Sequence, residues 1–445
     1  MTTTERLYSA LVHRDPEAEQ QLPAESRGAI APNGLRLVLA NSLQSSGDQV
    51  VNASTVLPWL FAALGVPPAL TGLLVPIREA GSMLPQAFLT PLILRVRYRK
   101  WVFVAGAFIQ AIAVAAMVST AALAEGLTAG VLIVAALAVF ALGRCLCSIS
   151  SKDVQGRTVP KGQRGQVNGL AATAAGLVAV TLGLIIRIVG GNDLSVEQLL
   201  WLLVLGVVLW IAVAAVYAGI REPAGEASGR PGPVEKTEPD SNNWLRQMVT
   251  LLREDLPFRH FVTVRSLLLV SSLSPPFLVT LSAQSGASSL TGLGGFIIAS
   301  GLAALIGGRL FGRFADRSSK KLMSLGAGVA SAIIITTVVV TVVPGVVIDT
   351  WLGNLLFVTA YFAVTLMHTG VRIGRKTYVV DMAQGDQRTI YVAVSNSAMG
   401  FILLLVGGLS SLLALVHISW ALLFLALLGI LGVVASARLP DVSQG

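Results

Sequence analysis

The sequence predicts an all-α integral membrane protein, with twelve transmembrane helices arranged as two pseudo-symmetric bundles of six. Three observations support this fold class: an apolar composition, twelve long apolar stretches, and a polar pattern that occurs once in each half of the chain. Hydrophobic residues make up 54% of the 445 residues and charged residues only 12%, with a mean hydropathy of +0.75. Soluble proteins carry about 25% charged residues, so the composition excludes a soluble enzyme.

Twelve apolar stretches follow one another along the chain. Each is long enough for a helix to cross the ~30 Å hydrocarbon core, which needs ~20 residues. None alternates apolar and polar residues as a membrane strand does, so we expect helices. The predicted spans are 35–63, 68–94, 101–123, 127–153, 165–189, 197–220, 257–285, 289–314, 321–344, 350–378, 389–414 and 417–438.

Lysine and arginine residues indicate the orientation of the chain. All except Arg78, Arg187 and Arg265 fall in the tails, in the even-numbered loops or at the helix ends beside them. Because cytoplasmic loops are rich in cations, both termini and the central loop should be cytoplasmic in a multi-pass protein of the cell membrane, here a bacterial inner membrane. The net charge of +9 lies in no folded soluble domain, so we expect no nucleic-acid partner.

Five regions follow from these features. They are a cytoplasmic tail (1–34), an N-terminal six-helix bundle (35–220), a cytoplasmic linker (221–256), a C-terminal six-helix bundle (257–438) and a cytoplasmic C-terminus (439–445). The tail has no signal-peptide pattern. The linker begins with a stretch rich in Pro, Gly, Glu and Ser, and its second part, 244–255, should form an amphipathic helix on the membrane surface.

A polar stripe closes the tenth predicted span. His368, Arg372, Arg375 and Lys376 share one face of a helix. Arg144, Ser148 and Lys152 close the fourth span at the same spacing as His368, Arg372 and Lys376. This internal repeat predicts that both halves direct a polar helix face toward a shared wet space.

Charged and polar groups also lie deep within the first two spans. Asn41, Gln44 and Asp48 belong to a polar stripe on the first span, and Arg78 and Glu79 lie at a depth similar to that of Asp48 on the second. Two interpretations stay open. Asp48 and Arg78 form a structural ion pair, or Glu79 or Asp48 takes up and releases a proton.

The seventh span contains Arg265, roughly 12 Å inside the membrane by helical rise. Its side chain either reaches back to the interface or faces the interior. Pro275 and Pro276 should bend the same span. Cys145 and Cys147 are interpreted as small buried hydrophobes, and no metal site is expected.

The loop between the eighth and ninth spans carries Gly312-Arg-Phe-Ala-Asp316-Arg317-Ser-Ser-Lys320-Lys321. This pattern resembles the signature cytoplasmic loop of the major facilitator superfamily. The resemblance implies two halves related by a pseudo-two-fold axis along the membrane normal. It also implies a central cavity lined by helices 1, 4, 7 and 10, which are the helices that carry the polar stripes.

The resemblance further implies a gate at the cytoplasmic ends. We expect gating residues at Gly312, Asp316, Arg317, Lys321, Lys152, Asp153, Arg375 and Lys376. Topology anchoring is the alternative for Lys152, Arg375 and Lys376. The first-half copy of the loop keeps its cations and lacks the Asp. Arg144 resembles the fourth-helix arginine of proton-coupled exporters. The fifth span contains no proline, so the Gly-Pro motif of drug/proton antiporters is missing.

These features predict a secondary transporter that works by alternating access. No phosphate-binding loop occurs, so no nucleotide cofactor is expected, and the chain should not be an enzyme. The expected substrate is a small organic anion, bound by Asn41, Gln44, Asp48, Arg78, Arg144, Arg265, His368 and Arg372. Asp48, Glu79 and His368 are the candidates for proton coupling, since histidine titrates near neutral pH.

Other interpretations stay open. One is a lipid or amphiphile flippase, or a drug efflux pump, of the same fold. Another is a membrane scaffold or sensor that transports nothing. The expected partners are the substrate, protons and the bilayer, and the protein should be a monomer. Substrate identity, direction and the choice between protons and sodium do not follow from the sequence.

Overall fold

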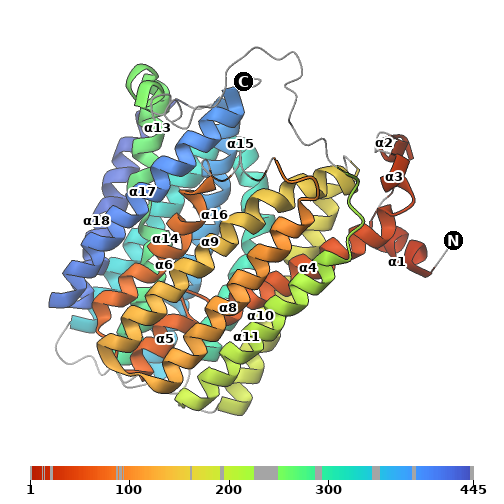
Figure 1. The fold of residues 1–445 in the computed structure, drawn as a ribbon. Helices are drawn as coiled ribbons and strands as arrows, with labels where there is room; N and C mark the ends of the chain where they lie inside the picture. Colours follow the sequence, from red (N-terminus) through yellow and green to blue (C-terminus); the bar gives the residue numbers. More distant parts are fainter. Residues whose placement is uncertain are drawn as a thin grey trace.

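The computed structural model describes residues 3–12, 14, 16–20, 24–86, 89, 93, 95–160, 163–190, 195–224, 249–285, 293–342, 351–382 and 387–440. Within these ranges the regular elements are helices, and no strand occurs (Figure 1). Among the described residues, eight helical segments are long and apolar enough to cross a membrane, and two shorter apolar helices accompany them. The chain is therefore an all-α, multi-pass membrane protein.

The helices fall into two consecutive groups. The first is α4 (Ile30–Val50), α5 (Val56–Ala63), α6 (Pro68–Met83), α8 (Lys100–Leu123), α9 (Gly126–Thr158), α10 (Arg164–Gly190) and α11 (Val196–Ala218). The second is α13 (Leu256–Leu267), α14 (Val270–Gln284), α15 (Leu293–Val342), α16 (Trp351–Met382), α17 (Gln387–Val416) and α18 (Ile418–Ser436). Each of the twelve predicted spans contains at least part of one of these helices. Part of the predicted surface helix at 244–255 lies outside the described residues, and 249–254 is helical.

Two predicted spans are broken. The first divides into α4 and α5 around residues 51–55, where Asn52 Oδ1 accepts a hydrogen bond from the Ser54 amide at 2.8 Å. This local side-chain bond competes with the helical pattern. The seventh span breaks at 268–269, between α13 and α14. Irregular backbone is tolerated at membrane depth where it is buried in protein or lines a cavity.

Pro275 and Pro276 lie within α14, so the break precedes them. Each proline lacks the N–H that would bond the carbonyl four residues earlier, and its ring crowds that carbonyl. Those carbonyls belong to Ser271 and Ser272, in the first turn of α14. The prolines therefore loosen the helix directly after the break.

The eighth and ninth spans run together in α15. The turn between them is made by Ser318, whose φ of −163° and ψ of 97° are extended rather than helical. Gly312, Asp316 and Arg317 lie in the helical stretch before this turn, and their side chains are outside the described part of the structure.

The two halves meet along two close helix–helix seams. In one, α10 packs on α15, and a Cβ added to Gly183 would lie 2.6 Å from Ile298 Cγ1 and 2.9 Å from the Gly294 carbonyl. In the other, α6 packs on α17, and a Cβ added to Gly407 would lie 2.1 Å from Pro76 Cγ. Small residues allow such close approach of helices in membranes.

The N-terminal tail packs against the first bundle through α1 (Thr3–Leu11). Tyr8 is fully buried, and its hydroxyl donates to Gln163 Oε1 at 2.8 Å, beside the start of α10. Burial raises the pKa of Tyr8 to about 12. At the other terminus, the Tyr378 hydroxyl on α16 donates to the Pro440 carbonyl at 3.0 Å. The termini thus lie near the ends of the bundles that the cation pattern assigns to the cytoplasm.

Candidate functional site

A cavity of about 250 Å³ lies between the two halves. The first half contributes the end of α4, the break between α4 and α5, and α6. The second half contributes α14, α15, α16 and α17. The polar lining residues are Gln49, Asn52, Ser54, Arg78, Glu79, Ser271, Ser272, Ser300, Tyr361, Thr365, His368, Thr369, Arg372 and Arg375. The two broken spans therefore both reach this space.

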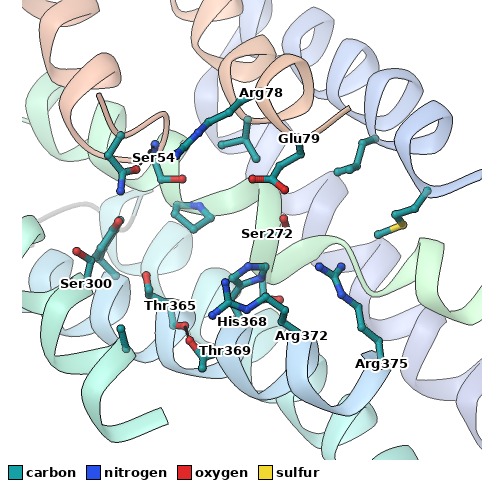
Figure 2. Close-up of a pocket in the computed structure, with 18 of the residues that line it drawn as sticks. Ser54, Arg78, Glu79, Ser272, Ser300, Thr365, His368, Thr369, Arg372 and Arg375 are labelled. Carbon is teal, nitrogen blue, oxygen red and sulfur yellow. Dashed lines mark hydrogen bonds between the residues drawn. The ribbon is translucent and has the colours of Figure 1, made fainter. Parts of the chain in front are cut away.

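One wall of the cavity is a helix face with three basic side chains. His368, Arg372 and Arg375 are spaced at i, i+4 and i+7 on α16, so they project from the same side (Figure 2). Within the part of the chain that is described, neither arginine has a carboxylate within 4.0 Å. The Nδ1 atom of His368 is buried and has no hydrogen-bond partner among those residues.

The opposite wall is formed by α6 and presents Arg78 and Glu79 (Figure 2). The Glu79 carboxylate has no ion pair within 4.0 Å in the described ranges. It faces the basic face of α16 across the cavity. The site therefore places an unpaired carboxylate opposite unpaired guanidinium groups.

Asp48 lies beside the cavity and is shared by two arginines. Arg78 donates to its Oδ1 at 2.8 Å, and Arg144 of α9 lies 2.7 Å from its Oδ2. The three side chains are 16%, 17% and 30% exposed for Asp48, Arg78 and Arg144. The ion pair that was one of the two interpretations of Asp48 is present, and Arg144 extends it to a triad that ties α4, α6 and α9 together.

Several predicted binding residues lie outside the cavity lining. Asn41 and Gln44 are half-buried on α4. Arg265 is 6% exposed, so it does not reach back to the interface. Its guanidinium donates to Ser395 Oγ and, at 3.0 Å, to Asn396 Oδ1 of α17.

Sequence reasoning did not single out some of the residues that line the cavity. Arg375, which the sequence places on the polar stripe as well as among the gating residues, lines the cavity. The hydroxyl-bearing residues were missed, because isolated serine and threonine are common in membrane helices and carry no distinctive spacing. Two signals could have found some of them: Ser54 lies in a helix break, and Ser271 and Ser272 lie four residues before the paired prolines.

The first half has a second charge cluster near the end of α9. Asp153 pairs with Arg99, and its Oδ2 lies 2.9 Å from Arg157 Nε in a second ion pair. Glu222, just beyond α11, lies 4.0 Å from Arg157 and accepts from the Lys100 amide at 2.8 Å. Burial raises the pKa of Glu222. The cation-rich loop before α8 lacks its own Asp, and its Arg99 and Lys100 contact carboxylates on α9 and after α11 instead.

Other predicted gating residues make few contacts that bear on a gate. Lys152 and Lys321 are exposed, and the Lys321 amide donates to Ser318 Oγ at 3.3 Å. The side chain of Lys376 lies outside the described part. Cys145 and Cys147 are buried free thiols, and the residues that are described contain no cluster of three or more His, Cys, Asp or Glu able to hold a metal.

Several solved structures with this fold are transporters. A POT family transporter in complex with 5-aminolevulinic acid aligns with a TM-score of 0.70 at 12% identity, covering 94% of this chain and 98% of that one. A D-xylose-proton symporter aligns with 0.69 at 12% identity, covering 92% and 98%. The nucleoside transporter NupG aligns with 0.63 at 14% identity, covering 91% and 98%.

Sequence comparisons give the family. Among curated proteins, none matches this chain. The family model of the Major Facilitator Superfamily matches residues 37–369, which is well over half of the chain. The match covers most of the first bundle, both helix breaks and, at His368, the beginning of the basic face of α16. The chain belongs to the major facilitator superfamily.

Proposed function

We propose that this protein is a secondary transporter that moves a small organic anion across the membrane by alternating access, coupled to protons. One observation carries the proposal. Two guanidinium groups, Arg372 and Arg375, line a cavity between the halves without a carboxylate partner among the described residues. An arginine edge matches the geometry of a carboxylate or phosphate group.

The charge balance around the cavity favours an anion. Asp48 neutralises only one of the two arginines that share it, so this triad keeps one positive charge in excess. Arg372 and Arg375 add two more, and Glu79 opposes them with one negative charge. A cleft of one sign in a low-dielectric surrounding concentrates ions of the opposite sign.

The size of the cavity limits the ligand. Its volume is about 250 Å³, below the roughly 300–1,000 Å³ of pockets for drug-sized ligands. Serine and threonine hydroxyl groups line it from α14, α15, α16 and the break between α4 and α5, and they offer further hydrogen bonds to a polar solute. These features favour a small polar anion over a bulky lipophilic drug or a lipid.

Glu79 is the proposed proton carrier. Asp48 is held by two arginines at 2.7 and 2.8 Å, so its carboxylate is already engaged in ion pairs. Glu79 has no such partner among the residues described, and it lines the cavity that both substrate and water would enter. Intramembrane carboxylates of this kind often serve proton relays. His368, on the facing wall, can assist.

The architecture is suited to alternating access. The halves touch along the glycine-rich seams between α10 and α15 and between α6 and α17. Glycines leave the helix surfaces smooth, as a rocking motion of the halves requires. We place the even-numbered connections and both termini in the cytoplasm and expect a monomer in the cell membrane. The D-xylose-proton symporter shares this fold, which supports proton coupling here.

Ligand-induced thermal stabilisation of the purified protein tests the proposal. A ligand that binds only the folded protein raises its melting temperature. The panel contains acetate, succinate, inorganic phosphate, xylose and tetraphenylphosphonium. We expect stabilisation by at least one carboxylate or by phosphate, and its loss in the double variant Arg372→Gln/Arg375→Gln.

The matched control is Arg95→Gln/Arg97→Gln, which removes the same charge from two exposed positions of a loop. This control should respond to the anion as the wild type does. Stabilisation by tetraphenylphosphonium alone would move the assignment to an efflux pump. An anion response that persists in Arg372→Gln/Arg375→Gln would reject the central site.

A further inference from the structure

Arg265 is a buried charge outside the central cavity. It lies nine residues into α13, and its acceptors Ser395 and Asn396 lie eight and nine residues into α17. By the helical rise of ~1.5 Å per residue, all three are roughly 12–14 Å from the starts of their helices. On the proposed topology both helices start at the cytoplasmic surface. The cluster is therefore inside the membrane, on the cytoplasmic side of the cavity.

The partners of Arg265 are neutral. Arg265 is 6% exposed, and its guanidinium contacts one hydroxyl and one amide oxygen. The Nε–H group is buried and has no acceptor among the described residues, and none of them places a carboxylate within 4.0 Å of the guanidinium. An isolated buried cation is costly because neutral acceptors do not offset its charge. An anion would offset it.

The cluster continues the elements that line the cavity. Ser271 and Ser272 follow Arg265 across the break between α13 and α14, and both line the cavity. Met399 lies one helical turn beyond Ser395 on α17 and also lines it. An anion that leaves the cavity toward the starts of α13 and α17 would therefore meet Arg265 next.

We propose that Arg265, Ser395 and Asn396 form a second anion site, occupied when α13 and α17 separate on the cytoplasmic side. This inference rests on the proposed function, since its ligand is the carboxylate or phosphate group of the transported solute. The guanidinium has five donors in a planar fork, and the hydroxyl and amide oxygens occupy two of them while the helices are together. A carboxylate can replace both acceptors in a bidentate pair.

Charge-selective thiol labelling tests the site without knowledge of the substrate. Asn396→Cys is introduced into the full chain with Cys145→Ala and Cys147→Ser, reconstituted in nanodiscs of neutral lipid. Initial rates are measured with an anionic sulfonatoethyl and a cationic trimethylammonioethyl methanethiosulfonate. Each rate is divided by the rate for the unfolded protein. Inorganic phosphate, succinate and an anionic-lipid nanodisc are then compared as protecting agents.

We expect the anionic reagent to react about tenfold faster than the cationic one. One unit charge at roughly 6 Å in a water-like dielectric attracts the anionic reagent and repels the cationic reagent, and the two effects multiply. Phosphate or succinate should slow the labelling in a saturable way. Arg265→Gln should abolish the preference, and Arg265→Lys should keep it. Arg259→Gln removes an exposed charge from the same helix and should keep the preference.

Three outcomes would overturn the site: no labelling under any condition, equal normalised rates for both reagents, or a preference that survives Arg265→Gln. Protection by anionic lipid alone would also overturn it, because the ligand would then be a headgroup. The variant Arg372→Gln/Arg375→Gln separates this inference from the proposed function. It should keep the labelling preference and lose the anion-induced thermal shift. A retained thermal shift would reject the central site, and the labelling preference would then decide by itself whether the Arg265 site exists.

Discussion

In the first half of the chain, Asp48 lies between two arginines and Asp153 pairs with two more. In the second half, Arg265, Arg372 and Arg375 have no carboxylate within 4.0 Å in the described part of the structure. Both halves carry a polar stripe at matching positions, yet among the described residues Arg78 and Arg144 of the first half contact a carboxylate, whereas the three arginines of the second half do not.

This difference separates two uses of charge within a membrane. An internally paired charge holds helices together, as Asp48 joins α4, α6 and α9. An unpaired cation at the cavity wall has a desolvation cost that no protein carboxylate offsets. A bound anion offsets this cost, so the unpaired cation favours anion binding. The repeated polar stripe therefore makes different contacts in the two halves.

The largest expected effect comes from breaking the Asp48 triad. Asp48→Ala leaves two partly buried arginines without their counter-ion, and breaking a buried pair in this way costs about 3–5 kcal/mol. We expect a severe loss of folded protein, measured by thermal unfolding in detergent. Removing the arginines as well, in Asp48→Asn/Arg78→Gln/Arg144→Gln, should recover most of the loss. A melting temperature for Asp48→Ala equal to that of the wild type would show that the triad is not structural.

Glu79 is the exception in the first half, because it is a cavity carboxylate without an ion pair among the described residues. Glu79→Gln should leave the melting temperature nearly unchanged. It should reduce proton-driven accumulation of the anion in proteoliposomes at least tenfold, while exchange of labelled for unlabelled anion continues, since exchange needs no net proton movement. Accumulation at the wild-type level would remove Glu79 from the coupling mechanism.

A smaller effect is expected at Glu222. Burial raises its pKa above the ordinary value of 4.5, so the folded state favours the protonated form. The stabilisation from protonated Glu222 is complete below pH 4.5 and is lost as the pH rises through the folded-state pKa. Glu222→Gln should therefore be as stable as the wild type or more so at pH 7.5, by less than about 1 kcal/mol.

The advantage of Glu222→Gln should shrink toward pH 5. Exposed Glu197 on α11 supplies the control substitution Glu197→Gln, which removes a carboxylate that is not buried. If Glu222→Gln were progressively less stable than the wild type as the pH rises, the ionised carboxylate would be a net stabilising partner of Arg157.

Long-range regularities made much of the fold predictable. The lengths of the apolar stretches predicted where the helices lie, and the loop around Asp316 indicated the family. Helix breaks were harder to predict. The break at 51–55 depends on a local bond between Asn52 and Ser54, and the break before α14 precedes the prolines that loosen it.

The candidate site was predictable at the level of helices rather than contacts. Charges on spans 1, 2 and 10 indicated a shared polar space, because charged groups in hydrocarbon are costly. Whether a charge is paired depends on helix rotation and tertiary contact. The sequence therefore did not reveal that Arg144 binds Asp48 or that Arg265 contacts α17.

We propose that buried arginines in the two halves have opposite roles. Arg144→Gln and Arg375→Gln each remove one positive charge, one from the Asp48 triad and one from the cavity wall. The most direct test measures, on both variants, the melting temperature without ligand and the shift produced by succinate or phosphate. We expect Arg144→Gln to lower the melting temperature and keep most of the shift, and Arg375→Gln to keep the melting temperature and lose most of the shift. The reverse pattern, or equal effects in both variants, would contradict it.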